Sequence, residues 1–414
     1  MPNRGPAPRA MTHRLVVVGA SLAGLRAVEA ARKSGFDGQI TLVGSEEHLP
    51  YDRPPLSKAY LDDAEPPTVE FRDEVTLRGE LAVELELGIA ATGLDTDSRV
   101  IALADGRELT YDALVIATGA TARRLPGTDS LVGVHALRTL DDAAQIRAAL
   151  NAGARTVVIG AGFIGSEIAS GARKRGLPVT VIEALPTPLI RAVGEEMGSR
   201  LARLHVENGT ELRCGAGVER LEGNGRVELV VLSDGTKIRA DLVVVGIGAV
   251  PATDWLRGSG LRIDNGIVCD ENLWTGTPGV YAAGDVANWH NPLFGRRMRL
   301  EHWTSAAQQG ASAARNALNP DAAKPYSTVP YFWSDWYGSR IQFVGSPDAD
   351  EIVTIEDRGD RLTALYRAGD RLSGALTLNG QADIMKFSGL ITKRTEWGDA
   401  VRFAESRCSA RATA

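Results

Sequence analysis

Two glycine-rich turns constrain the fold of this chain more than any other feature of its sequence. The first turn, residues 19–24, follows the β-branched segment 15–18, and the second, residues 160–165, follows the segment 156–159. Each turn opens an apolar segment of helical periodicity, and this context of strand, turn and helix separates a dinucleotide-binding turn from a chance glycine pattern. The glycines let the backbone approach a pyrophosphate, while the helix N-terminus supplies free N–H groups and partial positive charge. The sequence therefore predicts two dinucleotides on one chain.

Acidic residues follow the second strand of each predicted nucleotide unit. In the first unit the strand runs into Ser45 and Glu46, and an acidic side chain at this point normally binds a ribose hydroxyl, so Glu46 is the candidate. In the second unit Glu183 ends the strand, with no adjacent arginine to receive a 2′-phosphate. A carboxylate there binds the two ribose hydroxyls and repels that phosphate, which predicts NADH in preference to NADPH. Arg191, eight positions further on, is the residue that could reverse this preference.

The first nucleotide domain is interrupted by the second. Strands expected at 113–116 and 279–281 both run into small residues that allow a ligand to approach closely, and the complete second unit lies between them. After about residue 325 the pattern changes to an alternating meander of strands expected at 351–355, 361–366 and 371–378, joined by Gly-Asp turns and followed by a helix expected over 383–397. The expected parts are a disordered arm at 1–13, a first nucleotide-binding domain at 14–120 and 248–325, a second nucleotide-binding domain at 121–247, a C-terminal domain at 326–407 and a loose tail at 408–414.

Charge, hydropathy and cysteine content exclude several classes of function. A net charge of −6 argues against nucleic acid as a partner, because phosphate binding needs a basic surface. Only Cys214, Cys269 and Cys408 occur, with no close pair, so neither a cysteine-ligated metal nor a dithiol redox centre is expected. No apolar run approaches the ~20 residues that span a bilayer and no secretory signal is evident, so we expect a cytoplasmic protein without a membrane partner. The lack of a coiled-coil pattern favours a monomer.

Further motifs occur in the order typical of one enzyme family. They are PYDRPPLSK at 50–58, Ala-Thr-Gly at 117–119, Gly-Ile-Gly-Ala-Val-Pro at 246–251, Ala-Ala-Gly-Asp at 282–285 and Arg-Leu-Glu-His-Trp at 299–303. With the two glycine turns, these motifs resemble the FAD-dependent ferredoxin reductases that serve cytochrome P450s and ring-hydroxylating dioxygenases. The resemblance covers the chain to about residue 390. It implies a glutathione-reductase-like α/β fold with two Rossmann-type nucleotide-binding domains, holding FAD and NADH, and a C-terminal α+β interface domain.

The resemblance also implies roles for single residues. Asp285 would bind the ribityl chain, the backbone of Trp303 would lie near the flavin pyrimidine, and Arg53 would approach the FAD diphosphate. The implied FAD-binding residues are Gly19, Ser21, Leu22, Ala23, Gly24, Ser45, Glu46, Arg53, Pro54, Lys58, Ala91, Ala117, Thr118, Gly119, Arg138, Gly284, Asp285 and Trp303. The implied NADH-binding residues are Gly160, Gly162, Phe163, Ile164, Gly165, Glu167, Glu183, Arg191 and Gly248.

Three positions depart from the pattern of the family. Ser21 stands where many relatives have glycine, and Ser45 stands where an acidic residue is common, so the ribose role moves to Glu46 or is lost. Trp274 stands where many relatives have arginine.

Lys58 and Glu167 are the candidate catalytic residues. By the resemblance they would form an ion pair beside the flavin and nicotinamide rings, where Lys58 favours the anionic reduced flavin and Glu167 orients Lys58 and contacts the nicotinamide amide. The alternative is an exposed surface pair, which contributes about 0.5 kcal/mol.

Arg296, Arg297 and Arg299 form a candidate docking face for an acidic [2Fe-2S] ferredoxin, because complementary charge raises encounter rates. The alternative is a solvated basic face.

A nicotinamide does not pass single electrons and an iron–sulfur protein does not accept a hydride, so a flavin must stand between them. The leading hypothesis is an NADH:ferredoxin oxidoreductase that feeds a P450 or a Rieske oxygenase. Two alternatives stay open: reduction of a small acceptor such as a quinone or monodehydroascorbate, and a redox-sensing interaction protein similar to apoptosis-inducing factor.

Overall fold

The computed structural model describes residues 12–62, 64–128 and 130–412. The expected N-terminal arm, 1–13, lies almost wholly outside the described residues. The chain forms two compact units. The first consists of the described residues up to Tyr51 together with Glu70–Ala120 and Pro251–Thr328, and the second consists of Asp52–Val69, Thr121–Val250 and the residues from Val329 onward.

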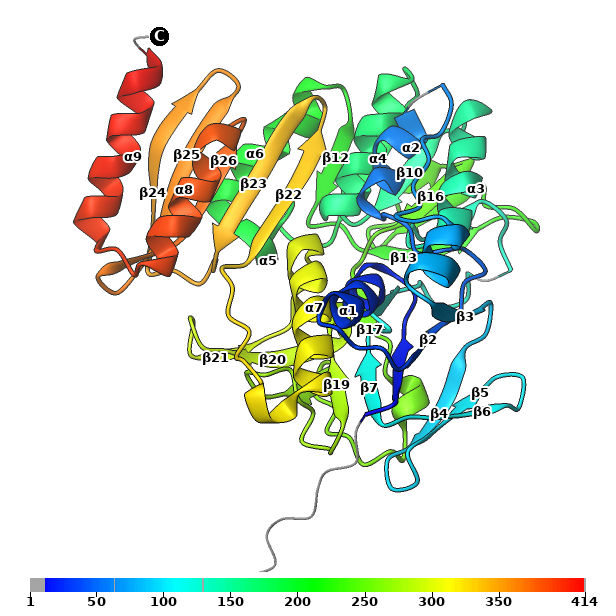
Figure 1. Ribbon diagram of the computed structural model, residues 1–414. Helices are drawn as coiled ribbons and strands as arrows, with labels where there is room; N and C mark the ends of the chain where they lie inside the picture. Colours follow the sequence, from blue (N-terminus) through cyan, green and yellow to red (C-terminus); the bar gives the residue numbers. More distant parts are fainter. Residues whose placement is uncertain (1–11, 63, 129, 413–414) are drawn as a thin grey trace, which may run out of the picture. The chain divides into compact units, whose positions relative to one another are not determined.

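A five-stranded parallel sheet forms the centre of the first unit, in the order β19-β7-β1-β2-β3. Its inner strands are buried on both faces, which is why they consist almost entirely of Val, Ile and Leu. Helices α1 and α7 pack side by side (Figure 1). The elements are β1 (Arg14–Val18), α1 (Leu22–Lys33), β2 (Gln39–Gly44), β3 (Val83–Leu87), β7 (Ala113–Ile116), β19 (Val280–Ala282) and α7 (Trp303–Leu318).

Two small sheets and several short helices complete the first unit. One sheet is an antiparallel meander of β4 (Ala91–Asp95), β5 (Val100–Leu103) and β6 (Glu108–Thr110). The other contains β18 (Ile267–Cys269), β20 (Ala287–Asn291) and β21 (Arg296–Met298). The short helices are η2 (Thr76–Glu80), η3 (Asp254–Leu256), η4 (Gly284–Val286) and η5 (Pro320–Ala322).

A second parallel sheet, in the order β12-β11-β10-β16-β9, repeats this plan in the second unit. A three-stranded antiparallel sheet follows it, and residues 233–236 form the hairpin connection between its last two strands. The parallel sheet and its helices comprise β9 (Val134–His135), α3 (Leu140–Asn151), β10 (Thr156–Ile159), α4 (Phe163–Lys174), β11 (Val179–Glu183), α5 (Ile190–Val193), α6 (Glu195–Glu207), β12 (Glu211–Cys214) and β16 (Leu242–Val245). The antiparallel sheet comprises β13 (Val218–Glu222), β14 (Leu229–Leu232) and β15 (Lys237–Arg239).

The segment Asp52–Val69 packs on the helices of the second parallel sheet. It contains η1 (Pro54–Ser57) and α2 (Ala59–Asp62), which contact α3 and α4. A side chain at Gly171 of α4 would collide with the carboxylate of Asp62, so the small residue allows this close approach. The contact brings the end of the PYDRPPLSK motif against α4.

The C-terminal part is an antiparallel sheet in the order β22-β23-β26-β25-β24 with two helices (Figure 1, yellow to red). The three meander strands were expected, but β22 and β23 were not. The helix expected over 383–397 ends early, and a second helix follows. Cys408 lies within that second helix, so the expectation of a loose tail is wrong as far as Ala412. The elements are β22 (Tyr331–Trp336), β23 (Ser339–Gly345), β24 (Glu351–Arg358), β25 (Arg361–Ala368), β26 (Arg371–Leu378), α8 (Gln381–Thr392) and α9 (Trp397–Ala412).

Two parallel sheets confirm the expected α/β class. In each sheet one strand, β1 or β10, runs into a glycine turn. In the second unit the C-terminal sheet shares an apolar core with α5 and α6, which includes Met197 and Trp336. The buried hydroxyl of Tyr366 donates to the carbonyl of Val193 at 2.6 Å, which pairs one polar group of this core.

Candidate functional site

Both glycine turns have the geometry of a dinucleotide cradle. Gly19 and Gly160 have φ values of 121° and 102°, a region that favours glycine. A side chain at Gly24 would collide with the carbonyl of Gly19, and one at Gly165 with that of Gly160, so each helix packs tightly on its own turn. Neither α1 nor α4 has an acidic residue in its first turn that would oppose an anionic ligand. Both turns therefore fit a pyrophosphate.

Most predicted FAD-binding residues of the first unit lie at one edge of its sheet. Strands β2, β1, β7 and β19 are parallel neighbours, so their carboxyl ends meet. At this edge the backbone N–H of Gly19 donates to the carbonyl of Val43, that of Ala117 to Val18 and that of Ala283 to Ile116, at N···O distances of 2.7–2.9 Å. The residues placed at this edge by their strands are Gly19, Ser21, Leu22, Ala23, Gly24, Ser45, Glu46, Ala117, Thr118, Gly119, Gly284 and Asp285.

The remaining predicted FAD-binding residues of the first unit are Ala91 and Trp303. Ala91 begins β4, directly after a segment whose Ile89 N–H donates to the carbonyl of Gly44. Trp303 is the first residue of α7. The carboxylate of Glu46 accepts a hydrogen bond of 2.5 Å from the Tyr51 hydroxyl, which fixes its orientation.

Four predicted FAD-binding residues belong to the second unit instead. Arg53, Pro54 and Lys58 lie on or beside η1, and the guanidinium of Arg53 donates to the carbonyl of Arg138. The backbone N–H of Arg138 in turn donates to Asp142 at 3.0 Å. No local sequence signal indicates that the segment Asp52–Val69 groups with the second unit.

The structure shows the local contacts or position of two of the three residues that depart from the family pattern, Ser21 and Trp274. Ser21 is the N-cap residue of α1, a position that serine commonly occupies. The indole N–H of Trp274 donates to the carbonyl of Thr277 at 2.8 Å, and its backbone N–H donates to Asp270. The tryptophan therefore closes a turn of the first unit.

Glu183 contacts the second glycine turn directly. One carboxylate oxygen accepts from the N–H of Ala161 at 2.8 Å and the other from that of Leu185 at 2.9 Å. Arg191 is exposed on α5, and Gly248 has a φ of 99°. Phe163 packs its ring against Phe332 at 4.6 Å, so its side chain belongs to the core and only its backbone faces the turn.

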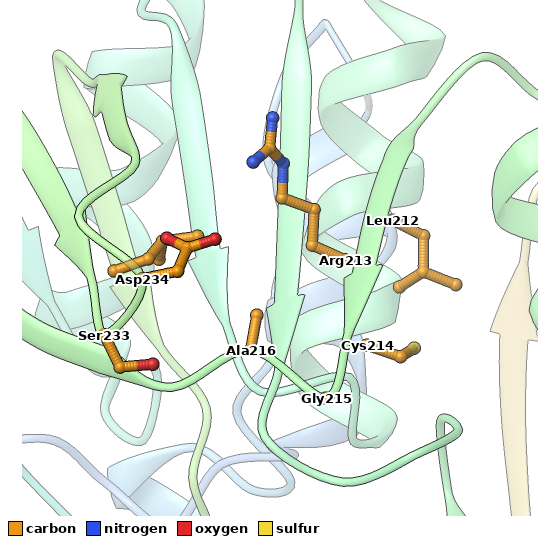
Figure 2. Close-up of a pocket in the computed structure, with 8 residues that line it drawn as sticks. Leu212, Arg213, Cys214, Gly215, Ala216, Ser233 and Asp234 are labelled. Atoms are coloured by element: carbon orange, nitrogen blue, oxygen red, sulfur yellow. The ribbon is translucent and has the colours of Figure 1, made fainter.

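A cavity of about 410 Å³ lies at the carboxyl end of β12 (Figure 2). Cys214, which pairs in register with Glu183, lines it. Burial and then the charge of Glu183 raise the pKa of the Cys214 thiol. The sequence analysis missed this cavity, because a loop after β12 and the hairpin after β14 form it jointly. Its lining residues are Leu212, Arg213, Cys214, Gly215, Ala216, Leu232, Ser233 and Asp234.

Lys58 and Glu167 form a partly buried ion pair. The Lys58 ammonium lies 2.7 Å from the Glu167 carboxylate, and the Glu167 side chain is only 2% exposed. The hydroxyl of Ser57 donates to the same carboxylate oxygen. The other oxygen accepts from the Ser334 hydroxyl at 2.5 Å and from the Asp335 N–H at 3.3 Å. This geometry excludes the alternative of an exposed surface pair, and the sequence analysis missed both serines.

The three predicted docking arginines differ in their surroundings. Arg296 and Arg297 are exposed on β21, but the guanidinium of Arg297 donates to the carbonyl of Cys269 at 2.6 Å. Arg299 is mostly buried and binds Glu301 at 2.8 Å and the carbonyl of Asp285 at 3.1 Å. The side chains of Arg297 and Arg299 are therefore also engaged within the chain.

The three cysteines are free thiols. Burial raises the pKa of Cys269 to about 12, so its thiol is inert near neutral pH. Across the residues that the structure describes, no cluster of His, Cys, Asp and Glu is suited to a metal ion. Within the same residues no helix is both long and apolar enough to cross a bilayer.

Comparison with known proteins agrees with this geometry. Residues 13–310 match the family described as pyridine nucleotide-disulphide oxidoreductase, and residues 331–414 match the reductase C-terminal family. A benzene 1,2-dioxygenase system ferredoxin–NAD(+) reductase subunit of Pseudomonas putida is 38% identical over 388 residues, which are 92% of this chain and 93% of that protein. Putidaredoxin reductase of the same organism is 35% identical over 393 residues, 92% of each chain.

The solved structure of a covalent putidaredoxin reductase–putidaredoxin complex superposes with a TM-score of 0.88. It shares 34% sequence identity and covers 93% of this chain and 94% of that one. The chain belongs to the pyridine nucleotide-disulphide oxidoreductase family. Within that family it is an FAD-dependent ferredoxin reductase, an enzyme with FAD and NAD(H) as its cofactors, as the motifs predicted.

Proposed function

We propose that the protein oxidises NADH and reduces a [2Fe-2S] ferredoxin that supplies a cytochrome P450 or a Rieske oxygenase. The observation that carries this proposal is the ion pair of Lys58 with the buried Glu167, in a chain with two nucleotide-binding edges and no paired thiols. The names of the relatives support it, because they are reductase components of a dioxygenase system and of putidaredoxin. This role places the enzyme in the cytoplasm.

Bound FAD supplies the conversion between hydride transfer and single-electron transfer. The chain's own residues hold and orient the two nucleotides. In this proposal the N-terminus of α1 binds the FAD pyrophosphate, Asp285 and Trp303 bind other parts of FAD, and the N-terminus of α4 binds the NADH pyrophosphate. Glu183 accepts hydrogen bonds from the adenosine ribose and disfavours a 2′-phosphate.

Lys58 provides a fixed positive charge beside the reacting ring. Its side chain is 22% exposed, and Glu167 holds its ammonium at 2.7 Å. A cation fixed in a partly desolvated site stabilises developing negative charge more strongly than a mobile surface cation does.

The contacts of Glu167 limit its proposed second role. A carboxylate offers about four acceptor positions, and each oxygen of Glu167 already accepts from two donors. Contact with the nicotinamide amide therefore requires one donor to be displaced. The Asp335 N–H, at 3.3 Å, is the most distant of the four.

The test is reduction of separate acceptors by the purified holoenzyme and NADH. With a [2Fe-2S] ferredoxin we expect fast bleaching of the iron–sulfur absorbance, and with small quinones slower turnover. Fast quinone turnover without ferredoxin reduction would favour the small-acceptor alternative. Slow turnover with every acceptor, combined with a long-lived charge-transfer complex with NADH, would favour the redox-sensing alternative.

A further inference from the structure

The two oxygens of Glu167 are held by different parts of the chain. Oε2 accepts from the Ser57 hydroxyl and the Lys58 ammonium, both in the segment Asp52–Val69. Oε1 accepts from the Ser334 hydroxyl and the Asp335 N–H, both on β22 of the C-terminal sheet. Rotation of the carboxylate would therefore break contacts on both sides at once.

The indole of Trp336 fixes the direction of the Ser334 hydroxyl. Its Nε1–H donates to Ser334 Oγ at 2.8 Å, and an indole N–H cannot accept a hydrogen bond. The single proton of Ser334 is consequently free to point at Glu167, 2.5 Å away. The result is a directed chain from Trp336 through Ser334 to Glu167.

Ser334 is the polar member of an otherwise aromatic face of β22. The buried face alternates Phe332, Ser334 and Trp336, and Ser334 and Trp336 are both 0% exposed. Phe332 packs on Phe163, the first residue of α4, so this face lies against the helix that carries Glu167. A hydroxyl in such surroundings costs stability unless it is paired, and its described partners are the indole and the carboxylate.

From this arrangement we infer that Ser334 is a positioning residue for the Lys58–Glu167 pair. The C-terminal sheet sets the orientation of the Glu167 carboxylate, which in turn sets the position of the Lys58 ammonium. The inference rests on the proposed role of the pair in the reduction of bound flavin by NADH. Its consequence is that the C-terminal domain contributes to the hydride-transfer half of the reaction.

The experiment compares holoenzyme variants in single-turnover flavin reduction. Ser334→Ala removes the donor, and Ser334→Thr keeps a hydroxyl. Trp336→Phe keeps an aromatic ring but removes the indole N–H. Thr377→Val is the matched control, because Thr377 is 0% exposed in β26 of the same sheet and its hydroxyl has no hydrogen-bond partner among the described residues. For each variant the rates of reduction by NADH and by dithionite, the NADH charge-transfer absorbance and the melting temperature are measured.

We expect Ser334→Ala to slow reduction by NADH at least tenfold and to weaken the charge-transfer band, without changing reduction by dithionite. Ser334→Thr should restore the rate to within about threefold of wild type, and Trp336→Phe should give an intermediate rate. Thr377→Val should leave the rate unchanged. A role in stability alone would lower the melting temperature of Ser334→Ala and leave the NADH rate at the wild-type value, and that outcome would overturn the inference.

Lys58→Met separates this inference from the proposed function. If Lys58→Met slows reduction by NADH and Ser334→Ala does not, the positioning role fails while the pair keeps its function. If Lys58→Met has no effect, the role of the pair fails and the inference fails with it. Should Ser334→Ala not fold, Trp336→Phe and Ser334→Thr decide the question, because a wild-type rate in Trp336→Phe contradicts the directed chain.

Discussion

The buried His205 pairs with the partly buried Tyr337, and the imidazole Nδ1 lies 2.7 Å from the phenolic oxygen. The other ring nitrogen lies 3.1 Å from the hydroxyl of Ser166, next to Glu167 in α4. The Tyr337 oxygen also contacts the hydroxyl of Thr210 at 2.9 Å. These contacts tie α4 and α6 to the turn between β22 and β23.

The first prediction concerns stability in acid. Burial lowers the pKa of His205 from 6.5 to about 4, so the folded protein keeps this histidine neutral. Between these pH values the unfolded chain binds a proton that the folded chain does not, and stability falls as the pH drops. The loss reaches about 3 kcal/mol once the pH is below both pKa values. His205→Gln should flatten this dependence when melting temperatures are compared between about pH 7.5 and about pH 4. His290→Gln, at a half-buried position, is the control, and an unchanged slope in His205→Gln would contradict the assignment.

Lys58→Met should slow reduction of bound flavin by NADH at least tenfold, because it removes the fixed cation, while FAD occupancy stays complete. Stopped-flow absorbance at the flavin band measures the rate. Lys174→Met is the control, because Lys174 is a 63% exposed lysine of the same unit that pairs with Asp62 at 3.4 Å. Equal rates of flavin reduction in the two variants would contradict the proposed role of Lys58 in the reaction.

Glu183→Gln should reduce the preference for NADH over NADPH about tenfold, since about 1.4 kcal/mol of charge repulsion against a 2′-phosphate corresponds to that factor. Glutamine keeps one acceptor oxygen, for the N–H group of either Ala161 or Leu185, and its amide NH2 replaces the acceptor of the other. The measurement is the ratio of kcat/KM for the two nucleotides. Glu219→Gln, an exposed site on β13, should leave that ratio alone; a ratio equally unchanged in Glu183→Gln would assign nucleotide choice to other residues.

Arg296→Glu should raise KM for an acidic ferredoxin several-fold at low ionic strength and leave ferricyanide reduction unchanged. Arg297 is a poorer probe, because its guanidinium also holds the carbonyl of Cys269. Arg257→Glu is the matched control, since Arg257 is 85% exposed and pairs with the neighbouring Asp254. An equal shift in KM for ferredoxin in the two variants would contradict the prediction that Arg296 belongs to the docking face.

Local sequence signals predicted the nucleotide-binding elements closely. The strand predicted from the β-branched segment 15–18 and the helix predicted after the first glycine turn match β1 and α1, because a β-branched strand, a glycine turn and a periodic helix are each encoded within a few residues. The strand expected at 371–378 also matches β26.

Other features depend on signals that were weak or distant. The helix expected over 383–397 ends at Thr392, and Arg394 adopts a φ of 53° without a glycine or proline to mark the break. The turn between β22 and β23 consists of Tyr337 and Gly338, both with positive φ. Tyrosine is not a residue typical of the first position of such a turn, so the sequence does not indicate a hairpin here. Ser334 could not be assigned from the sequence, because nothing near it indicates a carboxylate that lies 167 positions earlier in the chain.

The separation of these two residues has a consequence for synthesis of the protein. At typical translation rates, β22 leaves the ribosome on the order of ten seconds or more after α4. Until then Glu167 lacks the donors on one of its oxygens, and the nascent α4 keeps that face hydrated. The four donors of Glu167, and with them the proposed hydride-transfer geometry, can come together only after the chain has been made as far as β22, which ends at Trp336 of 414 residues.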